Sequence, residues 1–367
     1  MRHQEPDRGP KGELAVLPGF VQNTPRFLGI ESSGDPWRDQ GAVMEALGFD
    51  IFNAGWLEDP PEVVVEDDGR GNVLVRTALG ALISRTANTR NVLEPPIKST
   101  EDAYRFHFPP ASAYSNAGLR RYVEHTDLFL IGPIGGTFLA VQNLFEFETF
   151  MMATIYDRRA IAHVIDKVVA ANVEQARLLV EAGVHSLAVA DDLAHSGGVF
   201  LSPKTLRDLF FPPMKEEVAE LKKHGLPVFL HCDGDIREIL DDVVAMGFDG
   251  LHSLQPSANM DIAEIKRRYG KDLFLMGNID LNYVLTFGTL EEVEETVRRT
   301  IDVAAPGGGY ILTTCNCLVD AVRPENAWAM YRTAEEHGQY PVRTKGRPRN
   351  GGPHVAEAIE PRARRQP

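Results

Sequence analysis

The 367-residue sequence has little cysteine and no long hydrophobic segment. The three cysteines, Cys232, Cys315 and Cys317, are too few for the disulfide framework of a secreted domain, so a reducing, cytoplasmic location is expected. No run of about 18 apolar residues occurs, which argues against a membrane span. The N-terminus, "MRHQEPDRGPKGEL", has no apolar stretch of the signal-peptide type.

Positive charge is also scarce, because the formal net charge is −14. An acidic protein is not expected to have nucleic acid or an anionic membrane as its main partner, although a local site of either sign can bind a small molecule. Residues 343–367 differ from the rest, since they are basic and rich in proline and glycine. This composition predicts a disordered basic tail. Residues 1–25 are predicted to be an N-terminal extension that is partly disordered.

What the sequence does contain is a regular alternation of strand and helix patterns from about residue 125 onward. Short apolar runs end in Gly, Asp, Asn or His, and an amphipathic helix follows each of them. The runs are "LFLIGPIGG", "SLAVADD", "PVFLHCDGD", "GLHSLQP", "LFLMGNID" and "YILTTCN". Such alternation predicts an α/β fold with a parallel sheet, and the number of units favours a (β/α)8 TIM barrel over residues 26–342. No G-x-G-x-x-G follows a strand, which argues against a dinucleotide-binding fold.

Residues 60–110 break this alternation. The stretch "VVVEDDGRGNVLVRTALGALISR" is typical of a β-hairpin, with "DDGRGN" as its turn and "VLVRT" as a strand. We therefore predict a hairpin-containing insertion over one end of the barrel, where it could cover a substrate mouth.

Polar residues gather where the predicted strands end. In a barrel of this kind the C-terminal strand ends and the loops that follow them carry the working residues. Five such ends carry candidate residues: Asp191 and Asp192 in "AVADD", His231 and Asp233 in "FLHCDGD", His252 and Gln255 in "GLHSLQP", Asn278 and Asp280 in "MGNID", and Asn316 in "TTCNC". We expect them to converge on one mouth, with His195 on a nearby glycine-containing loop.

The alternation of side chains along a strand separates the cysteines from these candidates. His231 and Asp233 share one face of their strand, and Cys232 lies on the other. Asn316 likewise lies on the opposite face from the two cysteines that flank it. We therefore expect the three thiols to be buried in packing. A zinc site built from the three cysteines, with His231 turned away, is the alternative.

The same stretches resemble the uroporphyrinogen decarboxylase superfamily, which includes cobalamin-dependent methyltransferases. The resemblance runs through "LAVADDLAHSGGVFLSPKTLRDLFFPPMKEEVAELKKHGLPVFLHCDGDI", "GFDGLHSLQPSANMDIAEIKRRYGKDLFLMGNID" and "GGGYILTTCNCLVDAVRPENAWAM". It covers about residues 120–340 and implies a (β/α)8 barrel. Glu148, in "LFEFETFMM", matches a family glutamate.

In the methyltransferase branch, the resemblance implies a zinc site made of H-x-C and a later cysteine. The matching positions here are His231, Asp233 and Asn316, so the histidine is kept and both thiols are replaced. A histidine, carboxylate and amide set is harder than a thiolate set, and whether it holds zinc, another divalent metal or none is left open. The decarboxylase branch is implied to use an arginine-rich N-terminal motif, which Arg26 and Arg38 do not form.

Three functions follow from the resemblance. The first is a corrinoid-dependent methyltransferase that demethylates a small O- or N-methylated compound, with the corrinoid carried on a separate protein. In it His231, Asp233 and Asp192 would be catalytic, and the remaining candidates, including Glu148, would bind substrate. The second is a decarboxylase of porphyrin biosynthesis, in which Asp191 or Asp192 stabilises a ring intermediate. The third is a barrel that binds a ligand without turnover. Relatives also imply a possible homodimer.

Overall fold

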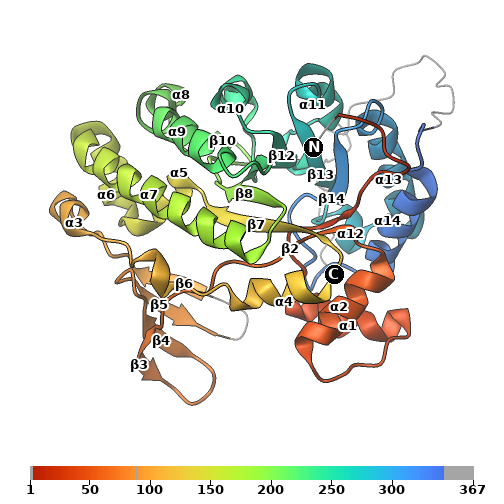
Figure 1. Cartoon of the computed structure of the whole chain (residues 1–367), viewed down its shortest axis with the longest axis horizontal. Helices are drawn as coiled ribbons and strands as arrows, with labels where there is room; N and C mark the ends of the chain where they lie inside the picture. Colours follow the sequence, from red (N-terminus) through yellow and green to blue (C-terminus); the bar gives the residue numbers. More distant parts are fainter. Residues whose placement is uncertain (1–2, 87–89, 343–367) are drawn as a thin grey trace, which may run out of the picture.

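The computed structural model describes residues 3–86 and 90–342 (Figure 1). Eight parallel strands form one sheet in the order β1-β2-β7-β8-β11-β12-β13-β14. A parallel bridge between Lys11 and Leu312, and a hydrogen bond of 3.0 Å from the Leu312 amide to the Pro10 carbonyl, bring its two edges together. The predicted TIM barrel is therefore confirmed. The strands are β1 (Gly12–Glu13), β2 (Ile51–Asn53), β7 (Phe129–Gly135), β8 (Ser186–Ala190), β11 (Val228–Cys232), β12 (Gly250–Ser253), β13 (Phe274–Ile279) and β14 (Tyr310–Thr314).

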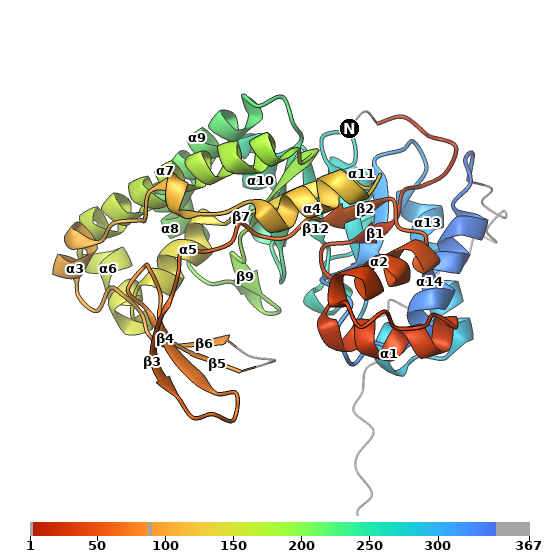
Figure 2. The same cartoon turned by 60° about the horizontal axis from the view of Figure 1, so that its bottom comes forward.

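Helices surround these strands, as the two cartoon views show (Figures 1 and 2). The longest, α7, starts at the N-cap Asp157 and ends at Gly183, whose left-handed conformation only glycine adopts readily. The helix α13 starts with the capping box of Thr289 and Glu292 that its sequence predicts. The helices are α1 (Pro18–Leu28), α2 (Pro36–Leu47), α3 (Thr100–Arg105), α4 (Ala117–His125), α5 (Thr137–Leu144), α6 (Phe147–Tyr156), α7 (Arg158–Ala182), α8 (Pro203–Thr205), α9 (Phe211–Lys222), α10 (Leu240–Met246), α11 (Ile262–Tyr269), α12 (Val284–Phe287), α13 (Leu290–Ala304) and α14 (Pro324–His337).

Apolar side chains form two clusters in the barrel and a third, of Val75, Ala81 and Ile83, in the insertion. A small cluster occupies the inside of the barrel and contains Ile51, Ile131, Ala188, Phe229, Phe274, Met276 and Ile311. A larger cluster lies between the strands and the surrounding helices, and Leu230 and Cys232 belong to it. Alternate residues of β11 therefore face opposite sides, as a parallel barrel strand requires.

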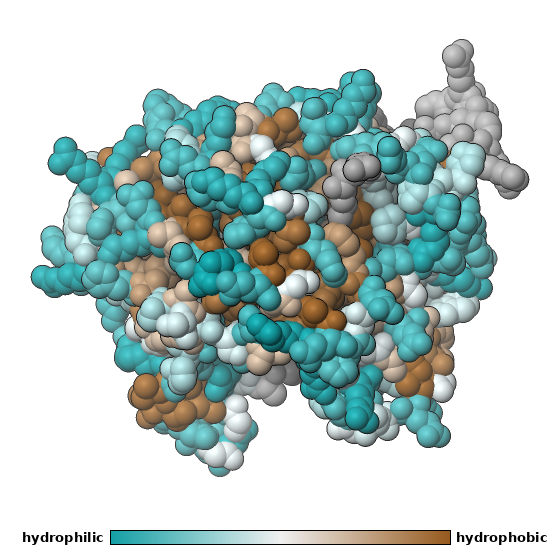
Figure 3. Space-filling view, viewed as in Figure 1, coloured by the Kyte–Doolittle hydropathy of each residue, from teal (hydrophilic) through white to brown (hydrophobic). Residues whose placement is uncertain are grey.

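The insertion is larger than a hairpin. The predicted hairpin forms β3 (Val63–Asp67) and β4 (Val73–Arg76), and β5 (Leu82–Arg85) and β6 (Arg90–Glu94) extend it to a four-stranded antiparallel sheet. Figure 2 shows this sheet beside α3 and α6, away from the barrel strands. The exposed valines of β3 contribute to the hydrophobic patch at the lower left of Figure 3. The insertion leaves the barrel at the C-terminal end of β2, and its covering of the mouth stays a prediction.

The N-terminal prediction needs correction. Residues 12 and 13 form the first barrel strand, and α1 begins at Pro18, so these residues are part of the barrel and not an extension outside it. The predicted tail, residues 343–367, lies outside the described residues. A short hairpin of β9 (Ala194–His195) and β10 (Gly198–Val199) follows β8. Within residues 3–86 and 90–342, no helix has both the length and the apolar character needed to span a bilayer.

Candidate active site

Polar side chains replace apolar ones at the C-terminal end of the barrel interior. On β11, His231 follows Phe229 on the inward face, and its backbone is in register with Ala190 of β8 and His252 of β12. Asp192 continues from the end of β8, and Asp233 from the end of β11. The strand geometry thus brings these residues together above the apolar cluster, as the sequence predicts.

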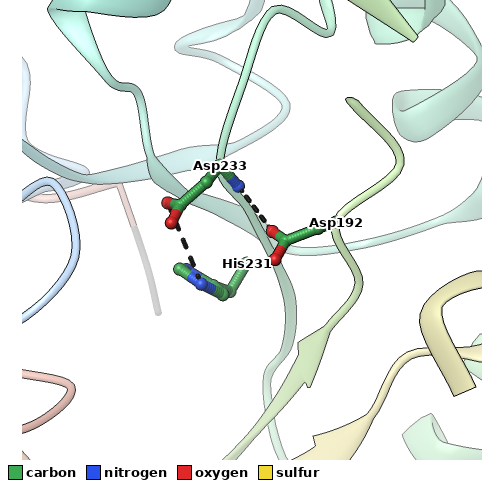
Figure 4. A group of neighbouring side chains, drawn as sticks. All are labelled: Asp192, His231 and Asp233. Atoms are coloured by element: carbon green, nitrogen blue, oxygen red, sulfur yellow. Dashed lines mark hydrogen bonds and ion pairs between the residues drawn. The ribbon is translucent and has the colours of Figure 1, made fainter. Parts of the chain in front are cut away.

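Asp192, His231 and Asp233 form a compact group (Figure 4). One possible ligand atom from each lies within 4.8 Å of the others, and Nε2 of His231 is 3.9 Å from Oδ1 of Asp233. The amide of Asp233 donates a hydrogen bond of 2.8 Å to Oδ1 of Asp192, which fixes one carboxylate against the next strand end. Burial raises the pKa of Asp192, and the nearby Asp233 carboxylate adds to the increase.

The two oxygens of Asp233 have different environments. Oδ2 accepts a hydrogen bond from the side-chain amide of Asn316. Within the described residues, Oδ1 is buried and has no hydrogen-bond partner. A buried carboxylate oxygen without a donor is unfavourable unless a ligand supplies positive charge or a hydrogen. The group therefore has the character of a binding site for a cation or a hydrogen-bond donor.

A second histidine lies directly behind His231. Nδ1 of His252 is 2.7 Å from Nδ1 of His231, and Nε2 of His252 is 3.2 Å from Oγ1 of Thr313 on β14. His252 is fully buried. This burial lowers the pKa of His252 well below its ordinary value, and His231 lowers it further, whereas hydrogen bonding to the Thr314 backbone raises it. His252 is thus a neutral interior residue behind His231, and its contact with substrate stays a prediction.

The structure also places Asp191 and Asn278 in structural positions. Asp191 is fully buried and accepts hydrogen bonds from the amides of Phe138 (3.0 Å) and Leu139 (2.7 Å), so it caps the N-terminus of α5. Burial raises its pKa to about 7. Asn278 has a left-handed backbone with φ of 78° and donates its side-chain amide to the carbonyl of Leu254 (2.5 Å). Both side chains thus make structural hydrogen bonds, and their contact with substrate stays a prediction.

Of three other predicted substrate-binding residues, two are exposed and Gln255 is partly buried. Gln255 donates to the hydroxyl of Ser257 at 2.9 Å, and His195 is exposed on β9 next to Phe200. Glu148 is exposed in the first turn of α6. Within the described residues, no hydrogen bond or ion pair joins any of the three to Asp192, His231 or Asp233. Their role in binding substrate stays a prediction.

The thiols take no part in the group of candidate ligands. Cys232 is 2% exposed, and its sulfur lies 3.3 Å from the amide of Leu193 in the outer core. Cys315 is buried as well, and Cys317 is partly buried. Burial raises the pKa of both Cys315 and Cys317 to about 12, and the nearby Asp233 carboxylate adds to the increase. Within the described residues, the group of side chains that could hold a metal ion contains no cysteine, so the alternative zinc site of three cysteines is not supported.

The donor set fits a divalent metal ion. One imidazole nitrogen and two carboxylates can bind an ion of intermediate hardness, such as Zn²⁺, Mn²⁺ or Fe²⁺. The unpaired Oδ1 of Asp233 is the strongest structural indication of such a ligand. Asn316, which the sequence suggests as a ligand, instead orients Asp233 through its amide. Asp192, which the sequence suggests only as a catalytic group, belongs to the possible ligand set.

Comparisons with known proteins agree with this architecture. The chain is 28% identical over 187 residues to the methylcobamide:CoM methyltransferase MtaA of Methanosarcina barkeri, which covers 50% of this chain and 53% of that protein. It is 25% identical over 262 residues to the uroporphyrinogen decarboxylase of Synechocystis sp., covering 68% and 71%. The chain thus spans about half the length of the MtaA protein. A solved methyltransferase from Methanosarcina mazei has the same fold, with a TM-score of 0.68, 18% identity and coverage of 90% and 94%.

A family model described as uroporphyrinogen decarboxylase (URO-D) matches residues 73–337, which is well over half of the chain. The match includes every candidate ligand and all the barrel strands from β7 to β14. The chain belongs to the uroporphyrinogen decarboxylase family.

Proposed function

We propose that this chain is a methyltransferase that takes a methyl group from a small O- or N-methylated compound and passes it to a corrinoid on a partner protein. The observation that carries the proposal is the unpaired, buried Oδ1 of Asp233 beside Nε2 of His231. Such a pair of electron donors attracts a cation that can polarise an oxygen or nitrogen atom. The likeness to the MtaA methyltransferase supports the same branch of the family.

Asp192, His231 and Asp233 would hold a divalent ion in this proposal. When bound, the ion would supply Lewis-acid polarisation of the heteroatom that loses its methyl group. The protein's own contribution is to hold the ligands in place: Asn316 fixes one oxygen of Asp233, and the Asp233 amide fixes Asp192. The corrinoid would be a second substrate, which its own protein carries to the site.

The charge of the site favours a neutral or cationic substrate. Two carboxylates face the mouth, and within the described residues no Lys or Arg side chain is ion-paired or hydrogen-bonded to them. A substrate with several carboxylates would meet repulsion there. Arg38 has a 73% exposed side chain next to Asp35, so it offers no counter-charge to this group.

Decarboxylation is the second candidate, because the likeness to the Synechocystis decarboxylase extends over 71% of that protein. It would use the same barrel mouth with Asp192 as a proton-exchanging group, whose pKa burial already raises. The two candidates differ in their substrates and therefore can be separated by assay.

The test is methyl transfer to reduced cobalamin, followed by its absorbance spectrum, with a panel of small methyl ethers and methylamines. We expect transfer by the wild type with added Zn²⁺ or Mn²⁺ and at least about 100-fold slower transfer by His231→Ala. The matched control is His125→Ala, which alters an exposed histidine at the end of α4 that has no predicted role in the site. Consumption of uroporphyrinogen without transfer from any methyl donor would reject the proposal in favour of the decarboxylase.

A further inference from the structure

Four polar side chains from the ends of β11, β12 and β14 form a row that runs from the barrel interior to its mouth. Thr313 lies innermost, then His252, then His231, and Asp233 lies at the mouth. Successive members are 3.2, 2.7 and 3.9 Å apart, measured between the facing atoms. The first two spacings are hydrogen bonds, but the last is too long for one. The hydrogen atoms in this row therefore determine what His231 presents to a ligand.

The position of each hydrogen follows from the fixed inner end of the row. Oγ1 of Thr313 is 2.8 Å from the carbonyl of Thr314, and a carbonyl can only accept, so the hydroxyl donates there. Oγ1 must then accept from Nε2–H of His252. His252 is fully buried, and no carboxylate of the described residues is hydrogen-bonded or ion-paired to it. The ring is therefore neutral, and its Nδ1 carries a lone pair. Nδ1 of His231 must therefore carry the hydrogen that joins the two rings.

The opposite assignment leaves groups unpaired. If Nδ1 of His252 carried the hydrogen, its Nε2 would need the hydroxyl hydrogen of Thr313, and the carbonyl of Thr314 would lose its donor. The resulting Nε2–H of His231 would lie 3.9 Å from Oδ1 of Asp233, too far for a hydrogen bond. Buried polar groups are almost always paired, so the first assignment is the one that this interior favours.

We propose that His252 and Thr313 are positioning residues that hold His231 as its Nδ1–H tautomer, so that Nε2 faces the mouth as an electron-pair donor. The ligand class follows, because Nε2 and Oδ1 of Asp233 are then two acceptors that face each other. Only a cation, or a group with hydrogens to donate such as an ammonium, can join them. His231 acts as a ligand or base in this state and has no Nε2 proton to give to a leaving group.

This inference concerns the site of the proposed methyltransferase but does not depend on which reaction occurs there. The tautomer is a property of the metal-free protein without substrate. A failure of methyl transfer would therefore not contradict the assigned tautomer. Conversely, finding His231 as the other tautomer would not exclude methyl transfer.

The direct test is two-dimensional ¹H–¹⁵N NMR of histidine-labelled, chelator-treated protein at a pH where the rings are neutral, with His231 assigned by its loss in His231→Gln. We expect His231 to show a protonated Nδ1 and an unprotonated Nε2. An unprotonated Nδ1 on His231 would overturn the inference, and this wild-type measurement needs no folded Thr313 variant.

A pair of Thr313 variants tests the inner end of the row. Thr313→Val keeps the shape but removes the hydroxyl, whereas Thr313→Ser keeps the hydroxyl and serves as the control. We expect a mixture of tautomers at His231 in the valine variant only, and about 10-fold weaker binding of Zn²⁺ than in the serine variant, measured by calorimetry. A folded valine variant with the wild-type tautomer would show that Thr313 does not position His231.

Discussion

Replacing Asp233 by Asn should stabilise the protein while it abolishes cation binding. In the wild type, Oδ2 of Asp233 is paired with Asn316. Within the described residues, Oδ1 is buried without a hydrogen-bond partner, and it faces Nε2 of His231 (Figure 4). An asparagine has the same shape, so its oxygen can accept from Asn316 while its amide nitrogen faces the histidine. Asp192 and Asp233 are neighbouring carboxylates, and the change removes one of them.

The size of the effect follows from the cost of the unpaired oxygen. The amide of the asparagine is still 3.9 Å from Nε2 of His231, but it carries no charge. Burying an unpaired charge costs more than burying an unpaired neutral group, so we expect about 1–2 kcal/mol to be recovered. With the usual unfolding entropy per residue, a chain of this length should then melt about 1–3 °C higher. Zn²⁺ binding should be lost, because a neutral amide is a far weaker ligand than a carboxylate.

The assay is differential scanning calorimetry in chelator, together with Zn²⁺ titration of the metal-free protein. Asp235→Asn is the matched control, because Asp235 lies two residues away but is already paired with Arg237 at 2.7 Å. That variant should bind Zn²⁺ normally and should not melt higher. If the Asp233→Asn protein melts below the wild type in chelator, the unpaired carboxylate of Asp233 does not destabilise the metal-free protein, and the reasoning is refuted.

Two further predictions concern buried carboxyl groups that support the site. Complete burial raises the pKa of Glu13 from 4.5 to about 8, so between these values the folded protein keeps a proton that the unfolded chain releases. The wild type should therefore lose on the order of 3 kcal/mol of unfolding free energy from pH 5 to pH 8, and urea unfolding of Glu13→Gln should show a smaller loss. Asp191→Ala removes the cap of α5 and should cost about 2 kcal/mol in the same assay at pH 7, whereas an unchanged midpoint would contradict the capping role.

The barrel could be predicted from sequence because its later strands are continuous apolar runs between well-capped helices. The first strand escaped prediction because it is only two residues long and includes a buried glutamate, Glu13. That residue is held by groups that are more than 300 positions away, namely the amide and hydroxyl of Thr314 and the hydroxyl of Tyr331. No local pattern contains such contacts, so the closure of the barrel is visible only in three dimensions.

Side-chain alternation succeeded on one strand and failed on another. It correctly placed Cys232 in the outer core and His231 on the inner face. On β14 the inward residue Ile311 implies that Cys315, not Asn316, continues the inner face. Asn316 still reaches Asp233, because the strand ends at Thr314 and the chain changes direction. The alternation rule holds only within a strand, and site residues often lie just beyond its end.

The substituted site keeps the charge of a thiolate site but changes its chemistry. The resemblance implies two cysteine thiolates at the positions of Asp233 and Asn316, which would carry two negative charges. Here the amide carries none, yet Asp192 supplies a second carboxylate from the adjacent strand end, so the ionised group again carries two. A divalent ion is therefore still balanced, while oxygen donors replace sulfur and shift the preference toward harder ions. A harder site does not favour a thiol as methyl acceptor, and for this reason the proposed substrate is an O- or N-methylated compound.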